Sequence, residues 1–548
     1  MFTKFYMNHL SVYDYVVFLI YFIIVSGYGY WVYWNKKKTG TSTKDYFLAE
    51  GSLTWWAIGA SIIASNISAE HFIGMSGSGF AMGLAIASYE WMAAATLIIV
   101  AVFFLPIYLK NKIYTMPQFL SGRYNNTVST LMAVFWLLVY VFVNLTSIFF
   151  LGAIAIETIT GIPFNVCIMA LAVFSALITL GGMKVIGYTD VIQVFVLVAG
   201  GLVTCYMALN MVSDKFSIST VMGALPVLKA EAGDHFHMIF SKGDKFYNEL
   251  PGIAVLVGGL WINNLNYWGC NQYIVQRALG ADLKTGRSGL LFAAFLKMLI
   301  PVIVVIPGIC AYVLYQHGYF HKEMMDASGT VKPDHAYPVL MNLLPTGLKG
   351  LAFAALTAAI VASLAGKCNS IATIFTLDIY KKFINEGASE KKMVNVGRWS
   401  VVVASVIAIV IAPALRSFDQ VYQFIQEYVG FISPGVFAIF LLGFFWKRTT
   451  SKAALTAALL TIPLSTLFKF LPEISSGAIE PIPFLNRMSW VFCIIIAVMI
   501  VITVADPDSK NNPQGLEIDT KMFKVSPSFM VASVIICGIL AALYTVFW

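Results

Sequence analysis

The stretch SIIASNISAEHFIGMSGSGF, from Ser61 to Phe80, decides how the rest of this chain is interpreted. It is apolar enough to lie in a membrane, yet its middle holds Asn66, Glu70 and His71 beside several glycines. An unsatisfied polar group in hydrocarbon costs several kcal/mol, so such a helix must face protein or a water-filled cavity. Interrupted helices of this kind near the bilayer midplane form ligand sites in membrane proteins. We therefore predict a broken helix with a binding site at its break.

The composition of the whole chain agrees with a membrane location. The 548 residues are 59% apolar and 11% charged, whereas ordinary soluble domains carry about 25% charged residues. The first apolar run, 13–34, is too long for a signal-peptide core and lacks a small-residue cleavage site, so it is interpreted as a true span. None of the seven cysteines has the spacing of a metal or disulfide motif. We predict an all-α polytopic protein that has the lipid bilayer as a partner and binds no nucleic acid.

Apolar runs of about 20 residues, the length that a membrane-spanning helix needs, recur along the chain. Most of the 35 Lys and Arg residues fall in alternate loops between them. Since Lys and Arg favour cytoplasmic loops, this pattern predicts that both termini lie on the non-cytoplasmic side of a cell membrane. The alternative is that a wrong number of spans produces this asymmetry by chance. However, one missed helix would disrupt the alternation of Lys-rich and Lys-poor loops after it. The fourteen expected spans are 13–34, 54–82, 84–109, 127–156, 163–181, 188–212, 251–278, 288–316, 349–380, 395–415, 420–446, 453–471, 487–505 and 527–547.

A second stretch, LAFAALTAAIVASLAGKCNS from Leu351 to Ser370, is built of small residues and places Ser363 and Lys367 on one helix face. It too is expected to face protein. Two five-helix halves, 54–212 and 251–446, fit a pseudo-twofold inverted repeat, with GGLWINNLNYWG as the counterpart of the first broken helix. The sequences of the two halves show no convincing repeat. One helix, 13–34, precedes them, and three follow within 453–548.

Ionisable side chains inside spans are expensive and are functional candidates by default. Five of them stay well inside a span however its ends are drawn. Carboxamide and aromatic side chains occur in the same spans. Hydroxyl groups both donate and accept hydrogen bonds, and an aromatic face covers a pyranose ring, so the group suits a sugar. The alternative is that these residues only stabilise helix packing through interhelical hydrogen bonds, each contributing about 0.6 kcal/mol. The five ionisable residues are Glu70, Glu90, Asp190, Lys297 and Lys367.

His71 is the single histidine within a predicted span, which leaves too few ligands for a metal site. It is either a packing histidine or, as we favour, a hydrogen-bonding partner of the ligand. No phosphate-binding loop, nucleophile elbow or metal motif occurs. The sequence therefore gives no support for an enzyme.

Several long runs of sequence are similar to the sodium:solute symporter family, and within it to the galactose and glucose cotransporters. The resemblance implies a LeuT-type fold of inverted five-helix repeats with discontinuous first and sixth core helices. It also implies symport of a hexose into the cell by alternating access, with sodium as the coupling ion. The runs include residues 45–92, YTDVIQVF (188–195), 250–279, NSIATIFTLDIYK (369–381) and GFFWKRTTSKAA (443–454).

The resemblance also implies roles for individual residues. The expected sugar contacts are His71, Glu90, Asn264, Lys297 and Gln426, with Tyr267 as a ring-stacking gate. The expected gate supports and outer lid are Asn66, Tyr140, Trp268, Met75, Tyr89 and Tyr422. The expected sodium site, made of backbone and side-chain oxygens, comprises Ala64, Ile67, Ala359, Ala362 and Ser363.

Four positions depart from the family pattern. His71 replaces Gln and Ala93 replaces Ser in the bacterial galactose pattern, which leaves the hydroxyl preference open, and Ala362 replaces a sodium-binding hydroxyl. Relatives with a second sodium site use hydroxyls where this chain has Lys367, together with an acid matching Asp190. We hypothesise that the Lys367 ammonium group pairs with Asp190 and fills the role of the second cation; the alternative is a stem that reaches toward the cytoplasm.

Other functions stay open at this point. A symporter of inositol, sialic acid, an amino acid or an anion would share the fold. A proton-coupled or uncoupled carrier is favoured only by the missing hydroxyl at Ala362. A sensor that binds sugar without moving it is the third alternative.

Overall fold

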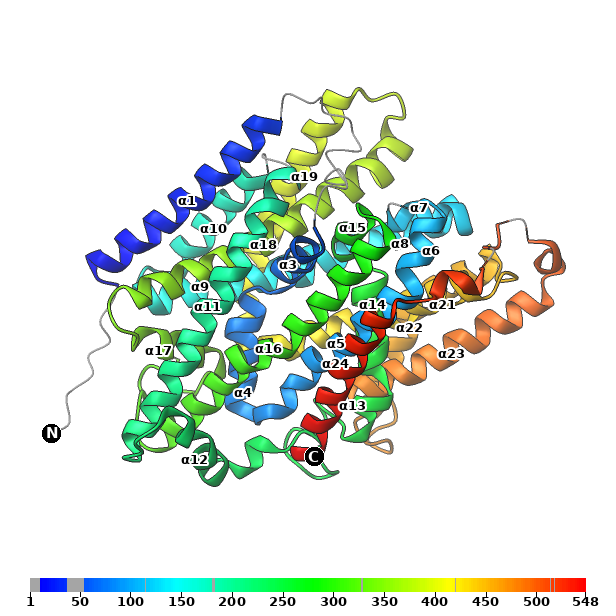
Figure 1. The fold of residues 1–548 in the computed structure, drawn as a ribbon. Coiled ribbons are helices and arrows are strands. Elements are labelled where there is room, and N and C mark those ends of the chain that lie inside the picture. The colour runs from blue at the N-terminus through cyan, green and yellow to red at the C-terminus, as the bar shows by residue number, and fades with distance from the viewer. Residues whose placement is uncertain are drawn as a thin grey trace.

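The computed structural model describes residues 10–36, 54–113, 115–179, 183–326, 329–418, 420–512, 514–516 and 518–548. These residues form α-helices joined by loops and by short 3-10 and π-helical segments (Figure 1). An isolated bridge between Met325 and Val331 is the sole β pairing within the described ranges. The predicted all-α class is confirmed.

The helices of the first half include the broken helix and its neighbours. They are α1 (Val12–Lys36), α3 (Trp55–Asn66), η3 (Glu70–Met75), α4 (Ser76–Met82), η4 (Gly83–Ala87), α5 (Ser88–Ile99), η5 (Val100–Phe104), α6 (Leu105–Lys110), α7 (Met116–Arg123), α8 (Asn126–Leu138), η6 (Val139–Leu145), α9 (Thr146–Thr160), α10 (Phe164–Thr179) and α11 (Met183–Lys215).

The second half begins after an irregular segment that contains η7 (Val221–Gly223), α12 (Ala224–Glu231) and η8 (Gly233–Phe236). Its helices are α13 (Ile253–Val257), α14 (Gly259–Gly269), α15 (Gln272–Leu279), α16 (Leu283–Gln316), η9 (Pro333–His335), α17 (Ala336–Asn342), α18 (Leu348–Ile374), η10 (Phe375–Ile384), α19 (Glu390–Ile411), η11 (Ala412–Ser417), α20 (Val421–Val429) and α21 (Ser433–Phe445). The C-terminal elements are α22 (Ser451–Ile474), α23 (Phe484–Ala505), η12 (Pro507–Asn511), η13 (Thr520–Phe523) and α24 (Pro527–Val546).

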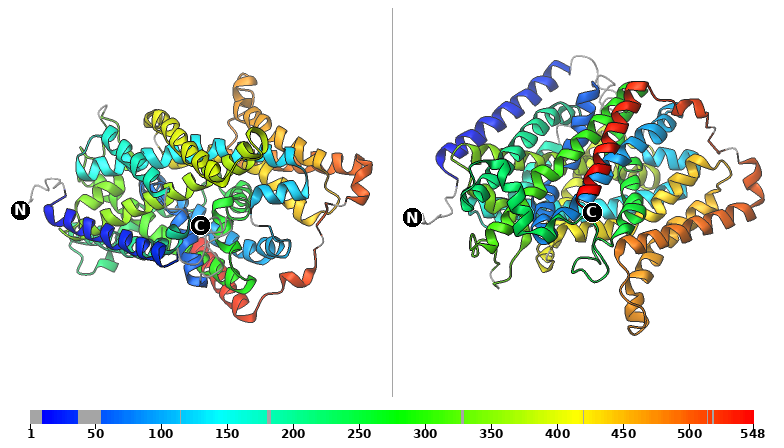
Figure 2. Two further views of the ribbon diagram at one scale, coloured as in Figure 1. Left: turned by 90° about the horizontal axis from the view of Figure 1, so that it is seen from above. Right: turned by 60° about the horizontal axis from the view of Figure 1, so that its bottom comes forward.

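Two helices organise the bundle. The long helix α16 packs on α3, α4, α5 and α11, and α18 packs on α1, α10, α11 and α19. The helices α1 and α23 lie at opposite ends of the molecule (Figures 1 and 2). Of the most apolar 18-residue window in 348–384, 89% is buried, against 22% in α24. The small residues of α18 therefore face protein, as predicted, whereas α24 presents most of its surface outward.

Close backbone contact fixes α16 against the broken helix. A Cβ atom added to Gly59 would lie 2.7 Å from the Gly289 carbonyl oxygen, and one added to Gly308 would lie 2.2 Å from that of Ser76. Both contacts are closer than a side chain permits, so glycine is required at each. Together they hold α16 against α3 at one end and α4 at the other.

Nine helical stretches in the described part of the chain are long and apolar enough to cross a membrane, or ten if the bent pair α20 and α21 counts as one span. The longest, Glu70–Lys110, has 41 residues and contains Gly83, where a φ of +73° ends α4. Two shorter apolar helices cover 12–25 and 164–173. This establishes a multi-pass membrane protein.

Candidate functional site

The candidate site lies where two helices are interrupted. Helix α3 ends at Asn66, and Ile67 has an extended backbone with φ −72° and ψ 123°. The chain resumes helical structure at η3, a π-helix that begins with Glu70 and His71. Helix α14 ends at Gly269, and Cys270 and Asn271 separate it from α15. The first interruption falls within Ser61–Phe80, and the second directly follows GGLWINNLNYWG (258–269), its predicted counterpart.

A buried ion pair forms the centre of the site. Lys297 Nζ, on α16, lies 2.5 Å from Glu90 Oε2, on α5. The same ammonium group donates to Asn66 Oδ1 and lies 5.0 Å from the ring centroid of Trp268. The side chain of Lys297 has no exposed surface and that of Glu90 is 4% exposed. Burial of this kind is tolerated because the charges are paired and hydrogen-bonded.

His71 connects the helix break to this pair. Its Nε2 lies 3.4 Å from Glu90 Oε1, and the Ser68 amide donates to its Nδ1 at 3.4 Å. Because Nδ1 accepts a hydrogen bond in this arrangement, the proton of a neutral ring is on Nε2 and points toward Glu90. The ring of Tyr422 lies 6.3 Å away, edge to face.

Carboxamides and aromatic rings from α14 and α20 complete the wall. Asn66 Nδ2 donates to the Tyr267 hydroxyl at 2.9 Å, and Trp268 Nε1 donates to Asn264 Oδ1 at 3.2 Å. The buried Asn264 Nδ2 makes no hydrogen bond within the described structure. An unused donor at such a position is free to bind a ligand hydroxyl.

These groups surround a cavity of about 60 Å³, which is room for a few water molecules and too little for a hexose. The side chains must therefore separate to admit a sugar. Of the predicted contacts and gate residues, Lys297 lies behind the wall, and Met75 and Tyr140 lie outside it. The wall consists of Asn66, Glu70, His71, Tyr89, Glu90, Ala93, Asn144, Asn263, Asn264, Tyr267, Trp268, Lys367, Tyr422, Ile425, Gln426 and Val429.

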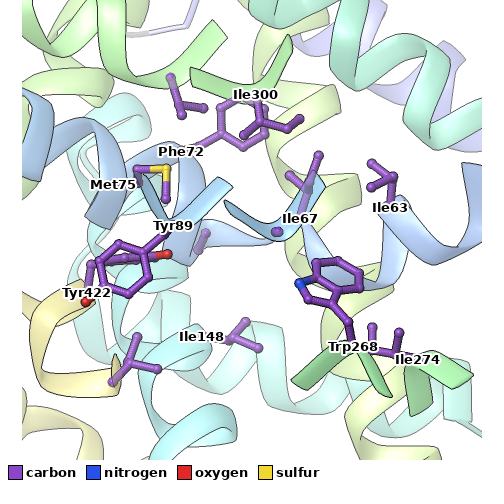
Figure 3. Close-up of a cluster of buried hydrophobic side chains, with 14 of the residues drawn as sticks. Ile63, Ile67, Phe72, Met75, Tyr89, Ile148, Trp268, Ile274, Ile300 and Tyr422 are labelled. Atoms are coloured by element: carbon purple, nitrogen blue, oxygen red, sulfur yellow. The ribbon is translucent and has the colours of Figure 1, made fainter. Parts of the chain in front are cut away.

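Aromatic residues close one side of this cavity. The rings of Tyr89 and Tyr422 meet edge to face at 5.5 Å, beside Met75 (Figure 3). The Tyr89 hydroxyl donates to Gln423 Oε1 at 3.5 Å. Tyr140 lies elsewhere, where its hydroxyl donates to Asn271 Oδ1 in the interruption after α14. Tyr140 thus holds the interruption between α14 and α15 in place and does not line the cavity.

The break after α3 also releases backbone oxygens. In a continuous helix the amides of Ser68 and His71 would donate to the carbonyls of Ala64 and Ile67. Here the Ser68 amide donates to His71 Nδ1, and the His71 amide donates to Ser68 O at 3.1 Å. Two carbonyl oxygens are thereby left without those helical partners.

The facing helix α18 supplies a hydroxyl that has no hydrogen-bond partner among the described residues. Helix α3 packs against α18, which carries Ala359, Ala362 and Ser363. Ser363 Oγ is fully buried and makes no hydrogen bond within the described part of the chain. A buried hydroxyl without a partner is costly unless a ligand or ion satisfies it.

One helical turn further along α18, Lys367 meets an acid from the broken helix. Lys367 Nζ lies 3.6 Å from Glu70 Oε2. Glu70 also accepts hydrogen bonds from Ser147 Oγ at 2.6 Å and Ser68 Oγ at 3.1 Å. The ammonium group is buried beside Glu70, so the alternative of a stem reaching the cytoplasmic surface is wrong. The side chain of Asp190 lies outside the described residues, and its pairing with Lys367 stays a prediction.

A family model for the sodium:solute symporters matches residues 46–461. The chain belongs to the sodium:solute symporter family. This family consists of transporters, which are not enzymes, and sodium is its coupling ion.

Among the relatives of this symporter is the sodium/glucose cotransporter of Vibrio parahaemolyticus, which is 48% identical over 98% of this chain and 99% of its own length. The sodium/myo-inositol cotransporter 2 of Mus musculus is 33% identical over 82% of this chain and 69% of its own. The substrate-bound, outward-open structure of a Na⁺-coupled sialic acid symporter has a TM-score of 0.74 at 21% identity, over 90% of this chain and 98% of its own. That likeness bears on the fold alone.

Some cavity residues of this symporter were missed by the sequence reasoning. Asn263 Nδ2 donates to Gln426 Oε1 at 2.9 Å, and both side chains line the cavity. The neighbouring Asn264 was predicted and Asn263 was not, because consecutive residues of a helix point about 100° apart and the sequence does not fix the rotation of α14. Glu70 was recognised as a buried acid but was given no role beside Lys367.

Proposed function

We propose that this protein imports a hexose of the galactose or glucose type, driven by sodium, through alternating access. The observation that carries the proposal is the cavity between the two helix breaks, where an ion pair, carboxamides and aromatic rings converge. Each of these groups matches a feature of a sugar, because hydroxyls both donate and accept and a ring face covers a pyranose.

The proposed topology has fourteen spans, two inverted five-helix repeats at 54–212 and 251–446, and both termini outside the cytoplasm. A helix of 41 residues would be about 60 Å long, twice the thickness of the hydrocarbon core. Glu70–Lys110 is therefore divided at Gly83 into two spans. Helices α1 and α10, the interrupted α13–α15 and the bent pair α20 and α21 supply the other spans.

Each substrate contact is assigned from its chemistry. Glu90 and Gln426 accept hydrogen bonds from sugar hydroxyls, the unused Nδ2 of Asn264 donates one, and the Tyr267 ring covers one face. His71 lies beside Glu90 and Lys297 lies behind it, and both hold the Glu90 carboxylate that meets the sugar. Since the cavity holds only a few waters, sugar enters when Tyr89 and Tyr422 part.

Sodium is assigned to the released oxygens of the first break. Ala64 and Ile67 contribute carbonyls, and α18 contributes Ser363 Oγ with backbone oxygens of Ala359 and Ala362. Oxygen ligands suit a hard cation. Because Ala362 has no hydroxyl, we expect a weaker sodium site than one with two side-chain ligands.

Coupling requires that sodium bind the outward-open and inward-open states with different affinities. A ligand with equal affinity for both states does not change their populations. A site divided between α3 and α18 meets this condition, because relative motion of the two helices separates its ligands. We propose that sodium favours the outward-open state and that both ligands are released inward. Lys367, with Glu70 or Asp190, occupies the place of a second cation, so one sodium accompanies each sugar.

The test is uptake of labelled sugar into proteoliposomes with sodium, or potassium in its place, outside. We expect galactose or glucose to accumulate only with sodium, and unlabelled competitors to identify the preferred sugar. The second candidate substrate is myo-inositol, because Ala93 lines the cavity and relatives at 33% identity are myo-inositol cotransporters. Accumulation of inositol alone would replace the hexose, and equal uptake in potassium would refute sodium coupling. Sugar binding without flux would indicate a sensor.

A further inference from the structure

We propose that a groove between α16 and α24 is a binding site for an anionic phospholipid. The groove has a volume of about 710 Å³ and lies on the outer surface of the bundle, away from the sugar cavity. Helix α24 runs beside α16 and α5 (Figure 1). The residues that argue for a lipid are Trp55, Lys284, Arg287, Phe295, Ser528 and Ile535.

Most of the groove is apolar and faces the membrane. Trp55 is 48% exposed, Phe295 is 46% exposed and Ile535 is 56% exposed. Exposed apolar side chains on a transmembrane surface contact acyl chains. Trp55 begins α3 at the same end of the bundle as Lys284, the level at which tryptophan anchors a helix to the membrane interface. The apolar part therefore fits an acyl chain.

The charges gather at one end of the groove. Lys284 is exposed in the first turn of α16, and Arg287 follows one turn later with 8% of its surface exposed. The exposed hydroxyls of Ser526 and Ser528 lie at the same end. In the topology proposed above this end is cytoplasmic. Basic pockets between membrane helices at that level bind anionic head groups.

Among the described residues, no acid accompanies the buried charge of Arg287. In this part of the chain its guanidinium donates to the backbone carbonyls of Ala101, Val102, Lys524 and Met522. No carboxylate lies within ion-pair distance of it or of Lys284 in the described part of the chain. The nearby Asp282 caps α16 and accepts from the amides of Lys284 and Thr285 and from the Thr285 hydroxyl. A phosphodiester at this end would supply the missing negative charge.

The site connects three parts of the transporter. Trp55 starts the broken helix α3, α16 carries Lys297, the partner of the cavity residue Glu90, and α24 is a peripheral helix. A lipid held between them bridges the cytoplasmic ends of α3, α16 and α24. We therefore expect bound anionic lipid to stabilise the bundle.

The experiment measures binding and stability of the full-length protein, so its outcome is independent of which solute is transported. Delipidated protein in detergent is titrated with phosphatidylglycerol or phosphatidylcholine, and retained lipid is read by native mass spectrometry and thermal stability by a melting curve. We expect phosphatidylglycerol to be retained and to raise the melting temperature, phosphatidylcholine to do so much less, and glycerol phosphate without acyl chains to have no effect.

Two variants test the two ends of the groove separately. Lys284→Gln should weaken phosphatidylglycerol binding about fivefold, the contribution of one lysine near an anionic surface. Ala532→Trp should block the acyl part without changing charge, since Ala532 lines the groove. The matched controls are Lys391→Gln, an exposed lysine of α19, and Val534→Trp, which is 65% exposed on α24 outside the groove. Equal retention of the two lipids, or equal loss in variants and controls, would overturn the proposal.

Discussion

The buried pair of Lys297 and Glu90 allows a quantitative prediction. Lys297→Met leaves the Glu90 carboxylate in the core with His71, at 3.4 Å, as its one potential ion-pair partner among the described residues. Glu90→Gln leaves an ammonium group that has no exposed surface and no carboxylate. Removing one member of a buried ion pair costs about 3–5 kcal/mol. We expect each single variant to lose about 3 kcal/mol of unfolding free energy.

The double variant, Lys297→Met with Glu90→Gln, separates the interaction energy of the ion pair from the cost of losing each side chain. With both charges removed, no uncompensated charge remains, so the second substitution should add no further loss and the double variant should be about as stable as either single variant. The coupling free energy is then about 3 kcal/mol, at the upper end of values for contacting residues. Unfolding in mixed detergent micelles, followed by tryptophan fluorescence, measures all three variants. Sugar uptake should be lost in all three, because each variant lacks a charged group assigned to the sugar site.

A matched control is available on the surface. Lys242 and Glu480 form a pair at 3.0 Å whose side chains are 77% and 81% exposed. Exposed ion pairs contribute little to stability, so Lys242→Met should leave the free energy of unfolding unchanged. If the two core substitutions were additive, or if each cost less than about 1 kcal/mol, the reasoning about a desolvated pair would be refuted.

Substitutions at three further positions test the assigned roles. Ser363→Ala removes the unpartnered hydroxyl of the sodium site and should reduce sodium-dependent accumulation to the level in potassium; normal accumulation would contradict the site. Lys367→Met should steepen the sodium dependence of uptake toward two ions per sugar, whereas unchanged sodium dependence with unchanged activity would exclude the role of a tethered cation. Tyr267→Phe keeps the ring and loses the hydroxyl bonded to Asn66, so the KM for sugar should rise about fivefold or less. Tyr267→Ala should raise it further, and equal effects of the two would argue against ring stacking.

The sequence was informative wherever a residue type conflicted with its surroundings. Asn66, Glu70 and His71 are costly in an apolar span, and the helix breaks where they occur. The small residues of 351–370 leave little side chain to face lipid, and α18 is buried among other helices. In both cases the local composition alone excludes a lipid-facing helix.

Contacts between distant helices were harder to predict. Helical spacing places Lys367 on the face of Ser363, but its contact with Glu70 depends on how η3 packs against α18. Gln426 was expected to meet the sugar, and its carboxamide oxygen accepts from Asn263, whose orientation depends on the rotation of α14. Such partners follow from the packing of whole helices, which single-residue patterns do not encode.

The first helix break places the proposed ion and sugar sites within reach of one residue, Ser68. Its amide donates to His71 Nδ1 instead of the Ala64 carbonyl, and its hydroxyl donates to Glu70 Oε2. A sodium ion that drew in the Ala64 and Ile67 carbonyls would move Ser68, and with it the hydrogen bonds that orient His71 and Glu70. His71 faces Glu90, and Glu70 faces Lys367, whose helix α18 also carries Ser363. If the proposed sites are right, coupling between the ligands needs no long path through the protein, because both ligands would bias the same short segment.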